Sequence, residues 1–130
     1  AIKKEYKKAI NMMVDAVRIK KNYMEGHYMI GLLYTKYYQE TNEYNHFLQA
    51  EKAFEYCISK NYNIPDIYVE AAKLYALVGN GSKAADYIDK AFKNGYTNID
   101  KILFDNIFDS VKDHPDFKKV ISYWYNKLKN

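Results

Sequence analysis

One pattern of side chains recurs three times along the sequence and limits what the chain can fold into. It places a small, a large and a small residue at positions i, i+4 and i+7, which share one face of an α-helix. The three copies are Ala9–Met13–Ala16, Ala50–Phe54–Cys57 and Ala84–Ile88–Ala91. Ala50 and Ala84 are 34 residues apart, and Ala9 and Ala50 are 41 apart. A repeat of this length predicts stacked helical units, each covering the apolar face of its neighbour.

The longer spacing fits the same array. It exceeds the shorter one by seven residues, close to two helical turns, so an insertion of this size leaves the inward face in phase. The additional residues fall around the stretch QETNEYNH at 39–46. The spacing therefore predicts that the hairpin of this unit is about two turns longer at its loop end.

Each of the last two triplets follows another apolar pattern. In the later unit the pattern has spacing i, i+3, i+4, i+7 and consists of Tyr68, Ala71, Ala72 and Tyr75. Pro65 and Gly79 bound it with the residue types that start and end helices. The same register, 41 residues earlier, falls on Gly31 and Tyr34. Small residues at these contacts predict close helix packing, and a larger side chain there would destabilise by about 1–3 kcal/mol or more.

These patterns resemble the tetratricopeptide repeat, a 34-residue helix-turn-helix unit. Its pattern of an aromatic residue, Leu-Gly and Tyr, followed by Ala, Phe and Ala, is matched by His27, Ile30, Gly31, Tyr34, Ala50, Phe54 and Cys57, and again by Tyr68, Ala71, Ala72, Tyr75, Ala84, Ile88 and Ala91. Tyr62 and Tyr96 stand where that unit usually has a proline. The resemblance implies an all-α fold, a right-handed α–α superhelix of stacked hairpins with about seven helices, in a single domain over residues 1–130.

The units expected in this domain are unequal. Residues 1–21 match only the second helix of a repeat, 24–64 form a repeat with the insertion, 65–98 form a repeat, and 99–130 resemble the capping tail of bacterial arrays. The helices are expected near 2–20, 24–39, 46–60, 65–78, 81–94, 99–110 and 115–128. In the cap, one apolar face consists of Phe117, Val120, Ile121, Trp124 and Leu128. Because the first helix lacks its partner, we expect residue 1 not to be the natural start, and self-association through this end is an open alternative.

Charge and composition narrow the function classes. The chain carries a net charge of +4, and residues 1–21 have seven basic against two acidic side chains. Nineteen of the twenty basic residues are lysines, whereas base and phosphate recognition favours the arginine guanidinium. A solvated basic helix face is thus favoured over nucleic-acid binding. No apolar run approaches the roughly 20 residues of a membrane span, so we expect a soluble chain. The cytoplasm is slightly favoured, and a cleaved leader in a longer parent is left open.

The sequence contains little that predicts chemistry. His27, His46 and His114 have no metal-ligand spacing, and Cys57 occupies a packing position typical of a buried, inert thiol. The stretch GNGS at 79–82 lacks the context of a phosphate loop. Four carboxylates near the cap suggest a wet acidic face, with a weak cation site left open: Asp105, Asp109, Asp113 and Asp116. We therefore expect a non-catalytic protein without cofactor or metal.

The resemblance also implies where a partner would bind. First helices of such repeats line a concave groove with their non-core positions. In this chain those positions are Glu25, Tyr28, Leu32, Thr35, Lys36, Asp66, Val69, Lys73, Ala76 and Leu77. The leading hypothesis is a scaffold or adaptor domain that binds a peptide or protein segment in this groove. The alternative is an accessory or dimerisation segment of a larger enzyme whose catalytic domain lies outside this chain.

Overall fold

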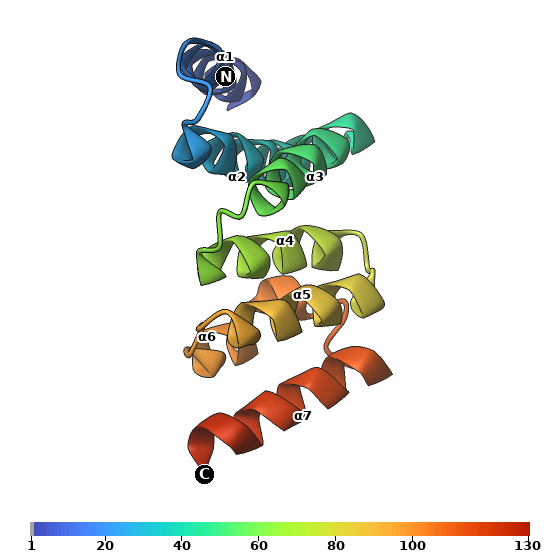
Figure 1. Cartoon of the computed structure of the whole chain (residues 1–130). Helices are drawn as coiled ribbons and strands as arrows, with labels where there is room; N and C mark the ends of the chain where they lie inside the picture. Colours follow the sequence, from blue (N-terminus) through green and yellow to red (C-terminus); the bar gives the residue numbers. More distant parts are fainter. Residues whose placement is uncertain (1) are drawn as a thin grey trace. The chain divides into compact units, whose positions relative to one another are not determined.

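The computed structural model describes residues 2–130 and is helical, with no strand in that range (Figure 1). The helices divide into two compact units, the first reaching to Tyr62 and the second beginning at Asn63. This boundary lies within two residues of the predicted limit between the repeats at 24–64 and 65–98. In this described range the structure is all-helical with seven α-helices, as the sequence predicts. In the described range, no helix is both long enough and apolar enough to span a bilayer.

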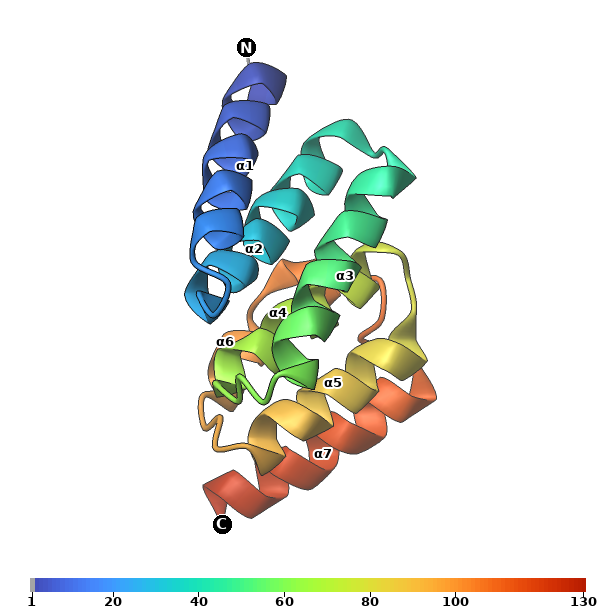
Figure 2. The same ribbon diagram turned by 45° about the horizontal axis from the view of Figure 1, so that its top comes forward.

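The first unit consists of three helices: α1 (Ile2–Ile19), α2 (Met24–Thr41) and α3 (Tyr44–Ser59). α2 and α3 form a hairpin, and α1 packs against α2 (Figure 2). The buried side chains come mainly from the periodic positions: Ile10, Ile30, Tyr37, Phe47, Ala50, Ala53, Phe54 and Cys57. The predicted face of α3 thus forms part of this core, whereas on the predicted face of α2 Ile30 and Gly31 are buried and His27 and Tyr34 are half-buried.

The hairpin α2–α3 is longer than its counterpart in the second unit. α2 has 18 residues and α3 has 16, against 13 each for α4 (Pro65–Leu77) and α5 (Gly81–Lys93). Asn42 turns the chain with a left-handed φ of 59°, a conformation that asparagine tolerates. The prediction that the insertion lengthens the loop end is confirmed. The loop expected between residues 39 and 46 is shorter in the structure, because α2 continues to Thr41 and α3 begins at Tyr44.

His46 was expected in the insertion and lies at the buried start of α3. Its Nδ1 shares a hydrogen bond of 2.9 Å with the Thr41 hydroxyl, and its ring stacks on Tyr37 with a centroid distance of 3.8 Å. Its Nε2 lies 3.6 Å from a carboxylate oxygen of Glu43. These contacts connect the two helices at the extended end of the hairpin.

The small residues lie where the helices approach most closely. A Cβ added to Gly31 would overlap the ring of Phe54 on the facing helix. Phe54 and the alanines and cysteine around it in α3 are almost completely buried. The sequence interpretation of small residues at close helix contacts is therefore confirmed in this hairpin.

The second unit contains α4, α5, α6 (Ile99–Leu103), the 3₁₀ helix η1 (Asn106–Phe108) and α7 (Pro115–Lys129). α4 and α5 form a hairpin, α7 packs against α5, and η1 packs against α4. The single helix predicted over 99–110 was wrong, because α6 ends at Leu103. Asp105 is extended (φ −88°, ψ 114°), and its carboxylate accepts a hydrogen bond from the Ile107 N–H at 3.0 Å. This local bond competes with helical hydrogen bonding and starts η1 instead.

α7 begins as the sequence predicts. Pro115 occupies the first turn, and Nδ1 of His114 accepts a hydrogen bond from the Asp116 N–H at 3.1 Å. Trp124 stacks on Phe92 of α5 with a centroid distance of 5.2 Å. Of the five residues predicted on the apolar face, Phe117 and Trp124 are buried, Val120 and Ile121 are half-buried, and Leu128 is exposed. Leu128 was therefore wrongly placed in the interface, since it lies near the end of the helix.

Candidate functional site

The ten predicted groove residues divide equally between α2 in the first unit and α4 in the second. On α2, Glu25 and Lys36 are exposed, while Tyr28 and Leu32 are half-buried. Thr35 is buried, and its hydroxyl donates a hydrogen bond to the Gly31 carbonyl oxygen at 2.8 Å. Because only 6% of Thr35 is exposed, it offers almost no surface to a guest.

The corresponding face of α4 is covered by the chain itself. Val69 and Ala76 are only 5% and 1% exposed, so their assignment to an open groove was wrong. The Ser110 hydroxyl donates a hydrogen bond to the Ala76 carbonyl oxygen at 2.6 Å, and η1 packs on the same helix. Asp66 is exposed, and Lys73 and Leu77 are half-buried. The segment after α5 thus lies where a guest was expected.

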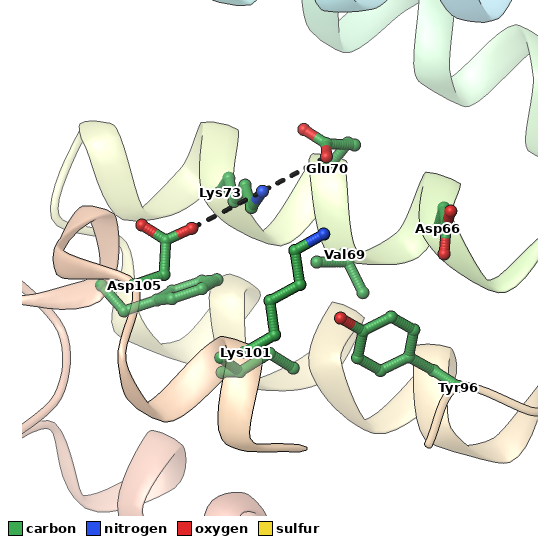
Figure 3. A pocket seen from close by; sticks show the side chains of 9 residues that line it. Asp66, Val69, Glu70, Lys73, Tyr96, Lys101 and Asp105 are labelled. Carbon is green, nitrogen blue, oxygen red and sulfur yellow. Dashed lines mark hydrogen bonds and ion pairs between the residues drawn. The ribbon is translucent and has the colours of Figure 1, made fainter. Parts of the chain in front are cut away.

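Charged side chains hold this segment to α4 (Figure 3). The Lys73 ammonium lies 3.3 Å from a Glu70 carboxylate oxygen and 3.6 Å from one of Asp105. The cavity beside them has a volume of about 40 Å³ and is lined by Asp66, Val69, Glu70, Lys73, Tyr96, Lys101, Ile102, Asp105 and Phe108. Such a volume suits one or a few waters. Burial and the nearby carboxylates raise the pKa of Tyr96.

The first unit has an open groove that the sequence analysis missed. It has a volume of about 330 Å³ and lies between α1, which provides Glu5, Tyr6 and Ala9, and α2, which provides Leu33 and Glu40. Sequence reasoning assigned Ala9 to a buried triplet and did not single out Leu33 or Glu40. The sequence pattern did not reveal this groove, because the groove depends on how α1 packs against α2.

The burial of the three triplets explains why this groove is open. The triplets of α3 and α5 are almost completely buried, whereas Ala9, Met13 and Ala16 of α1 are only half-buried. Met12 is 65% exposed and Met29 is 42% exposed. Met12 follows Ala9 by three residues, and Met29 precedes Leu33 by four, so each lies one turn along from a groove residue on the same helix face. The apolar surface thus continues beyond the groove.

A second open cavity lies between α6, η1 and α7. Its volume is about 350 Å³, and it is lined by Ile102, Leu103, Asp105, Phe108, Asp109, Lys112, Phe117, Lys118, Ile121 and Ser122. Leu103 on its edge is 43% exposed, and the neighbouring Phe104 is also exposed. Two large apolar side chains are therefore exposed at this end of the second unit.

Several of the groups that could carry chemistry have structural partners. The His27 ring packs on Tyr56 at 4.5 Å, and burial lowers the pKa of His27. Asp105 pairs with Lys73, and Asp109 lies 3.9 Å from Lys112. In the described part of the chain, no three His, Cys, Asp or Glu side chains gather as they would around a metal ion.

We expect Cys57 to be unreactive in the folded protein. It is fully buried, and burial raises its pKa to about 11, whereas only the thiolate is nucleophilic. At pH 8 a thiol reagent such as Ellman's should react on unfolding in urea and not before. Because the folded pKa exceeds the unfolded value of 9.0, this group's contribution to stability should be lost as the pH rises from about 9 to about 11. Rapid stoichiometric labelling of the native protein would contradict the prediction.

Comparison of the chain with protein-family models, curated proteins and solved structures gave no match.

Proposed function

We propose that this chain is a non-catalytic protein-interaction domain, built from stacked helical hairpins of the tetratricopeptide kind in a right-handed superhelix. Two features support the proposal. Between the hairpins α2–α3 and α4–α5, α2 and α4 keep one register at a spacing of 41 residues and α3 and α5 at a spacing of 34, and Gly31 lies at a helix contact of the first hairpin. Their loop ends differ by an insertion that leaves this register in phase. Such domains act by offering a surface to a partner segment.

The proposed binding surface is the groove between α1 and α2. The single observation that carries the proposal is this open, largely apolar groove beside an exposed methionine on each helix. The α4 part of the predicted groove is a poorer candidate, because the chain's own segment covers it. A concave apolar site with a few polar groups is the usual form of a binding site, and methionine side chains adapt to the shape of a guest.

Display of a random peptide library would test this function. We expect selected peptides to lose binding at least about tenfold to the variant Met29→Glu, because a charge would then face an apolar guest. Leu48→Glu on α3 is the matched control, since Leu48 is 43% exposed and Met29 is 42% exposed. Peptides that bind both variants equally, or failure to select any peptide, would contradict the proposal.

The cavity between α6, η1 and α7 favours the second candidate, an accessory or dimerisation segment of a larger enzyme. The apolar residues in its lining and the exposed Phe104 are suited to contact with another protein surface. Leu103 and the control position Leu48 are both 43% exposed. Repeating the same peptide selection with the variant Leu103→Glu therefore separates the two sites. Concentration-dependent self-association that is lost in Leu103→Glu alone would favour this second function.

A further inference from the structure

We propose that the occupant of the groove between α1 and α2 is an amphipathic helix carrying a lysine or arginine, with the cation held between Glu5, Glu40 and the ring of Tyr6. This inference rests on the proposed function, because it names the class of segment that the groove would bind. Three observations support it: the charges of the residues that line the groove, the aromatic ring of Tyr6, and the antiparallel direction of the two helices that form the groove.

The charges in the groove lining are all negative. Glu5 lies on α1 and Glu40 on α2, and the other residues that line the groove are Tyr6, Ala9 and Leu33. Among the described residues, neither carboxylate has a cationic side chain within 4.0 Å. Two carboxylates facing one groove without a counter-charge favour a cationic guest.

The basic character of α1 does not alter this local preference. Lys3, Lys4 and Lys7 stand one or two residues from Glu5, so they point to other sides of the helix. Lys8 follows Glu5 by three residues and Lys36 precedes Glu40 by four, so each shares a helix face with one carboxylate, but neither ammonium lies within 4.0 Å of it. The Lys3 ammonium lies 3.5 Å from Glu43, which follows the end of α2. At physiological ionic strength, charges more than about 8 Å away are largely screened. The charged side chains in the groove lining itself are therefore the two carboxylates, and these favour a cationic guest.

Tyr6 gives the groove an aromatic surface that is held in place. Its ring stacks on Tyr37 with a centroid distance of 5.5 Å and an interplanar angle of 20°. Tyr37 is itself buried and stacks on His46. A lysine or arginine over an aromatic ring gains a further electrostatic attraction. The ring and the two carboxylates therefore suit a cation better than a neutral polar group.

The apolar residues indicate how a guest would lie. Ala9 and Leu33 both line the groove, and Val17 lies against Gly26, so α1 and α2 run antiparallel. From the acidic end towards the turn that connects the helices, the surface passes from Ala9 and Leu33 to Met12 and Met29. The stretch from Glu5 to Ala16 of α1 is about 18 Å long at 1.5 Å per residue. A guest helix of about twelve residues, basic at one end and apolar along one face, matches this length and order.

Two synthetic peptides that differ in one residue would test the inference. Both are amphipathic helices of about 18 residues with leucine along one face, and the first turn carries lysine in one peptide and glutamate in the other. We expect fluorescence anisotropy at 150 mM salt to show at least about tenfold tighter binding of the lysine peptide. In the double variant Glu5→Gln and Glu40→Gln the difference should fall to about twofold. In Glu5→Lys with Glu40→Lys the preference should reverse. Glu55→Gln on α3 is the control, because it removes an exposed carboxylate outside the groove.

The possible failures of the inference and of the proposed function are distinguishable. Equal binding of both peptides, lost in Met29→Glu, would overturn the cation site and leave the proposed function standing. A preference for the lysine peptide that persists unchanged in the double glutamine variant would also overturn it, since the attraction would then come from elsewhere. If neither peptide binds and peptide selection also fails, both proposals are overturned. Circular dichroism of each variant should match the wild type, because both glutamates are exposed.

Discussion

Replacing Gly31 with leucine is expected to lower the free energy of unfolding of the first unit by about 3 kcal/mol. A Cβ at this position would already overlap the Phe54 ring, which is almost completely buried and cannot move away without disturbing its neighbours. The higher helix propensity of leucine would offset only about 1 kcal/mol of this loss. Urea denaturation followed by circular dichroism would measure the change.

Lys36→Leu is the matched control for this substitution. Lys36 lies on the same helix and is exposed, so leucine there should change stability by no more than about 0.5 kcal/mol. If Gly31→Leu unfolds at the wild-type urea concentration, then α2 and α3 do not approach as the structure shows. The repeat register inferred from the sequence would also be wrong.

Periodicity allowed most of the fold to be predicted, because helix faces that must be buried determine where apolar and small residues occur. The register between Gly31 and Phe54 and the in-phase insertion follow from spacing, and the start of α7 follows from Pro115, a residue type that suits the first turn of a helix. The break after Leu103 did not follow, because it depends on one side chain. The Asp105 carboxylate accepts a backbone hydrogen bond and then pairs with Lys73, and periodicity does not include such a contact.

The binding surface was harder to predict than the fold. The repeat pattern predicts that Val69 and Ala76 of α4 lie outside the core. Only the folded structure shows that the segment after α5 covers them. The groove between α1 and α2 depends on the packing of α1, which leaves Ala9 half-buried where Ala50 and Ala84 are fully buried. One signal was present in the sequence. Met12 and Ile19 extend the apolar residues of α1 beyond a single face, and both are exposed.

Trp124 is expected to be the most important single side chain in the second unit. It is buried, stacks on Phe92, and its Nε1 donates a hydrogen bond to an Asp89 carboxylate oxygen at 2.8 Å. Burial alone would raise the pKa of Asp89, but hydrogen bonds from Lys93 and Trp124 outweigh burial and lower it. Trp124 therefore contributes both apolar contact and a charged hydrogen bond to the packing of α7 on α5.

Trp124→Ala should therefore lower the free energy of unfolding of the second unit by about 3–5 kcal/mol, as measured by urea denaturation. Trp124→Phe keeps an aromatic ring against Phe92 and loses the bond to Asp89, so its loss of stability should be smaller, about 1.5–3 kcal/mol.

Deletion of residues 115–130 should have the largest effect, because it exposes Phe92 and the neighbouring face of α5 to water, and apolar patches of this kind drive association. Sedimentation velocity should then show oligomers that the full chain does not form at the same concentration. If the truncated chain stays monomeric and unfolds at the same urea concentration, α7 does not cap the apolar face of α5.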